Sequence, residues 1–177
     1  MIEFGLWAEC SDLSAKDAFA QHFRGLTHTL LNGRSIAWTV EDQGKPATLG
    51  VEVWCADISR SGIRTVADAI EVSEAGLRLI HHLLSAPGFL FARLDWQAPS
   101  IQLAEIGEHV CTYPDGSRGM YETCVMHDSV YDRLGAITGF QSFRPGYVWR
   151  PYLGERYEPV GSNDHPELFE LMRELQM

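Results

Sequence analysis

The sequence contains very little lysine, with only Lys16 and Lys45 against twelve arginines. A lysine nucleophile or a phosphate-binding lysine therefore has two candidates, and both lie in poor settings for that chemistry. Lys16 falls in the first turn of an expected helix and Lys45 in a polar turn, where solvated lysines normally occur. The chain also lacks a glycine-rich phosphate loop, G-x-S-x-G, H-E-x-x-H, C-x-x-C and a dinucleotide-binding fingerprint. These absences weaken the case for an enzyme.

Long apolar runs and close cysteine pairs are also missing. A membrane span needs roughly 18 apolar residues, and the richest stretch, 77–96, is interrupted by histidine, proline, glycine and arginine. No basic residue precedes Lys16, so we expect no secretory leader. The four cysteines are scattered along the chain: Cys10, Cys55, Cys111 and Cys124. Because a chain of 177 residues can fold without disulfides, we expect free thiols and a cytoplasmic protein.

Acidic residues outnumber basic residues by 24 to 14, which gives a formal net charge of −10. This charge repels phosphate groups, so we expect neither nucleic acid nor a membrane surface as a partner, and a cationic protein partner is favoured. Hydrophobic residues make up 45% of the chain and charged residues 21%, as in ordinary globular domains. We expect one domain over residues 1–177.

The apolar pattern predicts an α+β fold with a mostly antiparallel, or mixed, sheet and three to five helices packed on it. The expected strands are 2–8, 35–40 paired with 48–55, 89–96, and 109–113 paired with 120–126. The expected helices run from Ser14 to near Asn32, from Ser73 to before Pro87, over 100–108 and 129–134, and onward from a cap at Asn163 or Asp164. Residues 59–72 fit either a loop or a helix. Short strands and turns are expected over 140–159.

Four residues of the zinc-ligand type bracket the second expected hairpin: His109, Cys111, Cys124 and His127. If Tyr113 pairs with Met120, His109 lies opposite Cys124 and Cys111 shares their face, whereas His127 falls on the other face. Structural zinc sites usually use ligand pairs in knuckles, which this spacing does not supply. We therefore favour buried thiols and keep a metal site at His109, Cys111 and Cys124 as the less favoured alternative. We expect no cofactor.

Three further groups are weighed as sites. Cys10 precedes an expected helix and could act as a nucleophile, but the neighbouring acids would raise its pKa. His81 and His82 lie about 100° apart on a helix, so at most one faces the core, where a backbone carbonyl would satisfy it. The acids of 68–74 would form one edge of a helix, for which we favour a solvated face over a catalytic pair.

The most unusual stretch is 140–157, which contains six of the nineteen aromatic residues and three arginines. Arginine interleaved with tyrosine and tryptophan is typical of recognition surfaces, because guanidinium groups bind carboxylates and aromatic rings anchor with little loss of entropy. The alternative is that the arginines stack on the rings and stabilise an irregular segment. The candidate binding residues are Arg144, Tyr147, Trp149, Arg150, Tyr152, Arg156 and Tyr157.

Two functional hypotheses follow from these patterns. The first is a small acidic binding or inhibitor module that engages a protein partner, in the manner of the immunity proteins that neutralise toxins inside bacteria. The second is an enzyme whose anionic substrate is held by the arginines of 140–157, with a histidine or cysteine acting on it. The sequence names no catalytic residue. A homo-oligomer that buries this segment at its own interface is a third outcome.

Overall fold

The computed structural model describes residues 4–42, 49–55, 57–58, 62–96, 98, 101–120, 123–135, 137–157, 170 and 173–174. The helices in this part of the chain are α1 (Leu13–Phe23), α2 (Val66–Leu83), α3 (Asp128–Leu134) and the 3-10 helix η2 (Ile106–His109). The strands are β1 (Phe4–Glu9), β2 (Thr27–Thr29), β3 (Ser35–Ala37), β4 (Thr39–Asp42), β5 (Gly50–Trp54), β6 (Phe91–Trp96), β7 (Cys111–Thr112), β8 (Arg118–Gly119), β9 (Cys124–His127), β10 (Gln141–Arg144) and β11 (Tyr147–Trp149).

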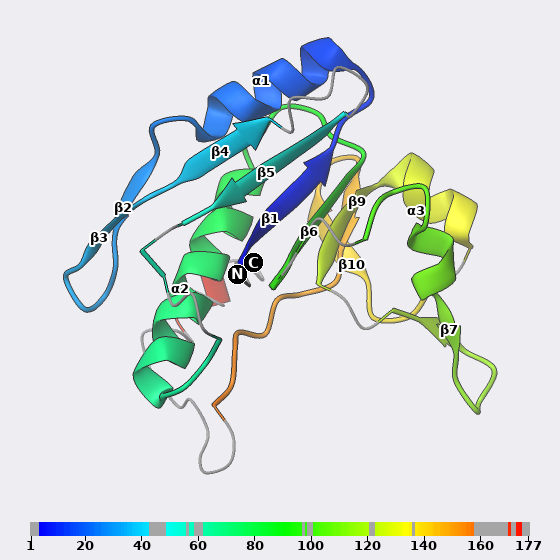
Figure 1. Cartoon of the computed structure of the whole chain (residues 1–177). Helices are drawn as coiled ribbons and strands as arrows, with labels where there is room; N and C mark the ends of the chain where they lie inside the picture. The colour runs from blue at the N-terminus through cyan, green and yellow to red at the C-terminus, as the bar shows by residue number, and fades with distance from the viewer. Residues whose placement is uncertain are drawn as a thin grey trace.

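The centre of the fold is a seven-stranded antiparallel sheet with the order β10-β11-β9-β6-β1-β5-β4 (Figure 1). The expected α+β class and antiparallel sheet are confirmed, and three α-helices in the described residues match the lower end of the predicted range. The sheet is larger than the predicted hairpins, because β1 lies in its interior and joins β5 to β6. Two short hairpins, β2–β3 and β7–β8, stand apart from it.

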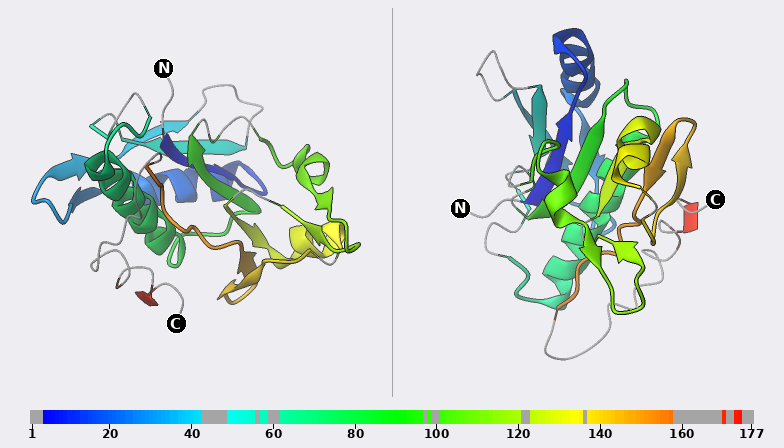
Figure 2. Two further views of the ribbon diagram at one scale, coloured as in Figure 1. Left: turned by 90° about the horizontal axis from the view of Figure 1, so that it is seen from below. Right: turned by 90° about the vertical axis from the view of Figure 1, so that its right-hand side faces the viewer.

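One face of the sheet is covered by α1 and α2 (Figure 2, left). The side chains of Leu6 and Ala8 on β1 join Phe19 of α1 and Ile80 of α2 in one buried cluster. Alternation along the strand explains this, because residues two apart share a face. Burying a large apolar side chain such as Leu6, Phe19 or Ile80 stabilises the fold by about 1.5–3 kcal/mol.

The opposite face has a second, smaller core. Trp7 of β1, Phe91 of β6 and Met126 of β9 are buried there together with Ile106 of η2 and Val130 of α3. The central strands β1, β6 and β9 are therefore buried on both faces. This second core positions the pocket described below.

Both long helices begin at a different residue from the one expected. The side chain of Asp12, not that of Ser14, accepts the backbone N–H of Ala15 at 2.9 Å and caps α1. The helix also ends at Phe23 rather than near Asn32, because Gly25 adopts a left-handed conformation (φ 74°) and β2 follows.

Helix α2 starts two turns before the expected cap at Ser73. Thr65 and Asp68 form a capping box, in which Thr65 Oγ1 accepts from the Asp68 N–H and Asp68 Oδ2 accepts from the Thr65 N–H, at 3.0 and 2.9 Å. Residues 59–72, which fit either a loop or a helix in the sequence, therefore belong to a helix from Val66 onward. Ser73 lies buried inside the helix.

The second expected hairpin is split between two sheets. Cys111 pairs with Gly119 in β7–β8, whereas β9 leaves that hairpin to pair with β6 and β11. The pairing of Tyr113 with Met120, which is the condition for bringing His109, Cys111 and Cys124 to one face, does not form, since the Tyr113 N–H bonds to the Ser117 carbonyl instead. Of the predicted helix over 100–108, only the 3-10 turn η2 forms in the described residues.

Some expectations lie outside the described residues. The turn at 43–48 does, and so does most of the expected last helix, including its caps Asn163 and Asp164. No helix in the described part of the chain is long and apolar enough to cross a membrane.

Candidate functional sites

Arg144 closes the C-terminal end of α2. Its Nη1 donates to three backbone carbonyl oxygens, those of Leu83 (3.0 Å), Leu84 (3.2 Å) and Ala86 (2.6 Å). The guanidinium also lies over the rings of Phe89 and Tyr147, 5.2 and 4.2 Å from their centroids. A helix end leaves carbonyl groups without partners, and a cation satisfies them well. The contacts of Arg144 are thus those of a structural residue.

Three aromatic residues of 140–157 are buried in the core. Tyr147 accepts the Phe89 N–H and donates to the Phe89 carbonyl at 3.0 and 2.9 Å, and Trp149 is 1% exposed. Tyr152 packs against Gly76 of α2, where an added Cβ would come within 2.5 Å of its ring. Their rings therefore contact the fold itself, and a binding role for them stays a prediction.

The end of the segment, 150–157, runs beside α2 (Figure 1), and Leu153 and Arg156 are its exposed residues. Its path is fixed by Glu155, whose N–H donates to Ser73 Oγ at 2.7 Å and whose carboxylate accepts from Tyr152 Oη (2.9 Å) and Trp96 Nε1 (3.2 Å). Between these anchors, Leu153 is 63% exposed, the highest value among the large apolar residues described as exposed.

The other candidate residues of this segment divide between the sheet and the surface. Arg150 is half-buried, with its guanidinium beside Gly139 and its backbone N–H bonded to the Cys124 carbonyl. Arg156 is exposed and Tyr157 half-buried at the end of the segment. Of the seven candidates, Arg156 is the exposed one, Tyr147, Trp149 and Tyr152 are buried, and the other three are half-buried.

The residues proposed as metal ligands are not brought together by the observed register. Cys111 faces Gly119, to whose carbonyl its thiol donates at 3.2 Å, and Cys124 is fully buried in the main sheet beside Arg93. His109 ends η2, outside either strand. Among the described residues, no group of three or more histidine, cysteine, aspartate or glutamate side chains could hold a metal ion.

Cys10 is a poor nucleophile in this structure. It is 2% exposed, and burial, with a further contribution from Asp12, raises its pKa to about 12. Reactive cysteines need the opposite shift, towards the thiolate. Burial also raises the pKa of Cys55.

His127 serves as the N-cap of α3. Its Nδ1 accepts from the Ser129 N–H at 3.2 Å and lies 2.8 Å from Ser129 Oγ. Because a backbone N–H can only donate, Nδ1 is the unprotonated nitrogen and the neutral ring carries its proton on Nε2. This serine–histidine contact is explained by helix capping.

The rings of Trp38, His28 and His82 form a series of hydrogen bonds that joins the β2–β3 hairpin to α2. Trp38 Nε1 donates to His28 Nδ1 at 2.9 Å, and His28 Nε2 lies 2.9 Å from His82 Nε2. Indole can only donate, so His28 must carry its proton on Nε2 and donate it to His82. The same tautomer argues against a shared metal ion, since the lone pair that would bind it is absent from His28 Nε2.

The environments of His28 and His82 both favour the neutral form of the imidazole ring. Burial lowers the pKa of His28, and burial together with the neighbouring histidines lowers that of His82 to about 4. His22 of α1 donates from Nε2 to the His82 carbonyl at 3.2 Å. His82 is half-buried and His81 exposed, as the helix geometry predicts, although the partner of the His82 ring is another histidine rather than a backbone carbonyl.

The acidic edge of α2 is paired rather than solvated, which corrects the sequence interpretation. Asp68 belongs to the capping box, and Glu71 forms an ion pair with Arg34 of the β2–β3 loop. Glu74 is 1% exposed, and its carboxylate accepts from the Leu31 N–H at 2.8 Å. Glu71 and Glu74 connect the small hairpin to α2. They are not a catalytic pair, which would need two carboxyl groups of different pKa in one cavity.

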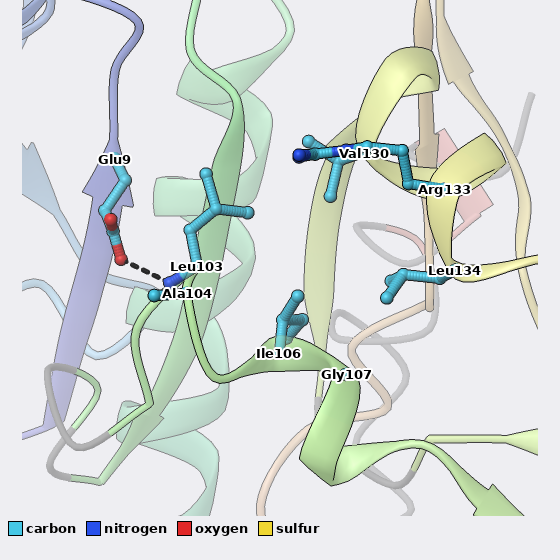
Figure 3. Close-up of a pocket in the computed structure, with 8 residues that line it drawn as sticks. All are labelled: Glu9, Leu103, Ala104, Ile106, Gly107, Val130, Arg133 and Leu134. Atoms are coloured by element: carbon cyan, nitrogen blue, oxygen red, sulfur yellow. Dashed lines mark hydrogen bonds between the residues drawn. The ribbon is translucent and has the colours of Figure 1, made fainter.

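A pocket of about 530 Å³ lies on the second core, between the end of β1, η2 and α3 (Figure 3). Most of its wall is apolar, with one carboxylate and one guanidinium at its sides. The lining residues are Glu9, Leu103, Ala104, Ile106, Gly107, Val130, Arg133 and Leu134. None of these belongs to 140–157, and neither Cys10, His109 nor His127 lines the pocket.

The sequence patterns predicted neither the pocket nor the contact between His28 and His82. His28 and His82 lie 54 positions apart, and Glu9 and Arg133 come from the first strand and the third helix. No local spacing signals such pairs. From the sequence, the apolar face of α2 indicates only that His82 can face inward, and it does not indicate its partner.

Comparison with known proteins finds no relative: no protein-family model, curated protein or solved structure matches the chain. Its function must therefore be inferred from its own geometry.

Proposed function

We propose that this protein is a binding or inhibitor module that engages a protein partner through the exposed part of segment 150–157. The observation that carries the proposal is Leu153, whose side chain is 63% exposed on a segment anchored on both sides of it. Single exposed apolar residues are common on surfaces. An exposed leucine on a stretch fixed by buried Tyr152 and by Glu155 is a better candidate for an anchor.

Rigidity is what makes this surface suitable for binding. Association loses free energy when loops and side chains become ordered, by about 0.5–1.5 kcal/mol per immobilised long side chain. The backbone around Leu153 is already held by the contacts of Glu155 with Ser73 and Trp96. A partner would therefore meet a preformed shape.

Charge suggests the chemistry of the partner. The net charge of −10 favours approach of a cationic protein. At the contact itself, exposed Arg156 would pair with a carboxylate at the rim around Leu153. We further propose a cytoplasmic location, because all four cysteines are free and three of them are buried. These properties match a small acidic module of the immunity-protein type.

Site-specific photo-crosslinking tests the proposal. A benzophenone amino acid is placed at Leu153 and, as the control, at Leu13, which is 54% exposed at the start of α1, at the far end of the molecule (Figure 1). In native cell lysate we expect one adduct from position 153 that position 13 does not give. Excess wild-type protein should abolish it, and excess Leu153→Asp protein should not. The same adducts from both positions, or no adduct at 153, would refute the proposal.

The enzyme alternative has less support in the described residues. Of the three arginines that would hold its anionic substrate, Arg144 is bound to carbonyl groups at the end of α2. Arg150 and Arg156 lie outside the lining of the described pocket.

A further inference from the structure

The pocket between β1, η2 and α3 has charges of opposite sign on opposite walls. Figure 3 shows Glu9 on the β1 side and Arg133 on the α3 side, with apolar side chains between them. We propose that this pocket binds a small zwitterionic ligand that carries an ammonium group and a carboxylate at the two ends of a short apolar chain. This site goes beyond the proposed protein-binding function and does not depend on it.

Arg133 is suited to hold the carboxylate end. It lies in the last turn of α3 and is exposed, and its guanidinium extends over the pocket (Figure 3). Within the described part of the chain, no hydrogen bond or ion pair occupies it. The planar guanidinium group binds a carboxylate through two parallel hydrogen bonds, which fixes the direction of the ligand.

Glu9 is suited to hold the ammonium end. Its Oε1 accepts from the Leu103 N–H at 2.6 Å and from Trp7 Nε1 at 3.2 Å, so the carboxylate is oriented by two donors on one side. No described residue donates to Oε2. A ligand ammonium group could donate to this oxygen without displacing an existing contact.

The wall between the two charges suits an apolar chain. Ile106 and Val130 are 5% and 1% exposed and form part of the second core, and Leu103 and Leu134 complete the lining. A volume of about 530 Å³ falls within the usual range of small-molecule pockets. A simple fatty acid would bring its chain here but leave Glu9 without a cation, and a simple amine would leave Arg133 without an anion. A zwitterion satisfies both.

Titrations followed by amide chemical shifts test this proposal. The probes are 4-aminobutyrate, 6-aminohexanoate and 8-aminooctanoate, compared with hexanoate and hexylamine, which each lack one charge. We expect saturable shifts at the amides of Leu103, Gly107 and Leu134, with at least one zwitterion binding about tenfold more tightly than both singly charged probes. Equal affinities for all five probes, or no saturable shift at these amides, would overturn the proposal.

Two variants assign the ends of the ligand. Arg133→Gln should weaken the preferred zwitterion and hexanoate but leave hexylamine unchanged, and Glu9→Gln should weaken the zwitterion and hexylamine but leave hexanoate unchanged. Arg24→Gln, at an exposed arginine after α1, is the matched control and should change nothing. Loss of binding in the control, or none in Arg133→Gln, would contradict the assignment. The Leu153→Asp protein should retain the full titration, which separates this site from the partner surface.

Discussion

Replacing His82 by glutamine should flatten the loss of stability that the wild-type protein undergoes between pH 7 and pH 5. Protonation of His82 would place a hydrogen on Nε2, facing the Nε2–H of His28 at 2.9 Å. His28 could adapt only by moving its proton to Nδ1, where Trp38 Nε1 already donates. Either response loses one of the two hydrogen bonds, so the folded state resists the proton and the unfolded state does not.

The sign and the pH window follow from the shifted pKa. The folded-state pKa of His82 is lowered from 6.5 to about 4, so between these values the unfolded chain binds the proton and stability falls as the pH falls. The full shift corresponds to about 1.8 kcal/mol between pH 7 and pH 5. Because His82 is only half-buried, solvent screening reduces this to about 1 kcal/mol.

Urea unfolding of the wild type and of His82→Gln at pH 7 and pH 5 measures the effect. We expect the wild type to lose about 1 kcal/mol more than the variant over this interval. The comparison cancels groups common to both proteins, such as Glu71, whose pKa is raised by burial and whose effect has the opposite sign. Equal losses in the two proteins, or a His82 pKa at or above 6.5 by NMR titration, would refute the reasoning.

The remaining predictions concern three other contacts. Arg144→Met should lower the free energy of unfolding by about 2–4 kcal/mol in urea, because three carbonyl groups at the end of α2 lose a charged donor; a loss below about 0.5 kcal/mol would contradict this role. Gly76→Ala should displace the Tyr152 ring, 2.5 Å from the added Cβ, and increase proteolysis of 150–157 in a native digest; unchanged cleavage would count against the packing. At pH 8, iodoacetamide should alkylate half-exposed Cys111 before Cys10, whose pKa is about 12; mass spectrometry showing the reverse order would refute the assignment.

The elements that could be predicted from the sequence are those decided by local pattern. The first strand, the strand at β5 and the stop of α2 before Pro87 are decided by neighbouring residues, and the structure has them close to where they are expected. The start of α2 was also readable, since Thr65 and Asp68 have capping-box spacing, but the serine and glycine residues just before them favoured a loop equally. Periodicity extended α1 too far, because it counts apolar spacing and gives no weight to Gly25 as a stop.

What could not be predicted is which distant groups meet. Composition makes Arg144 a candidate for binding, yet its Nη1 is bonded to carbonyl groups 58 to 61 positions away. The acids of α2 look solvated until Arg34 and Leu31 of another element are placed beside them. The pocket needs Glu9 and Arg133 to be brought together by the sheet. Such contacts depend on tertiary packing, which a single sequence does not encode locally.

The position of β1 in the interior of the sheet also has a consequence for folding during synthesis. Gly5 pairs with Trp54 on one side, and Phe4 pairs with Trp96 on the other. Strand β1 therefore leaves the ribosome before either neighbour exists: one hydrogen-bonding edge stays open until β5 has been made, and the other until β6 has been made. Long-range pairing of this kind slows folding, and an unpaired apolar strand is exposed to aggregation in the meantime. The strand that organises the finished sheet is thus the one that waits longest for its partners.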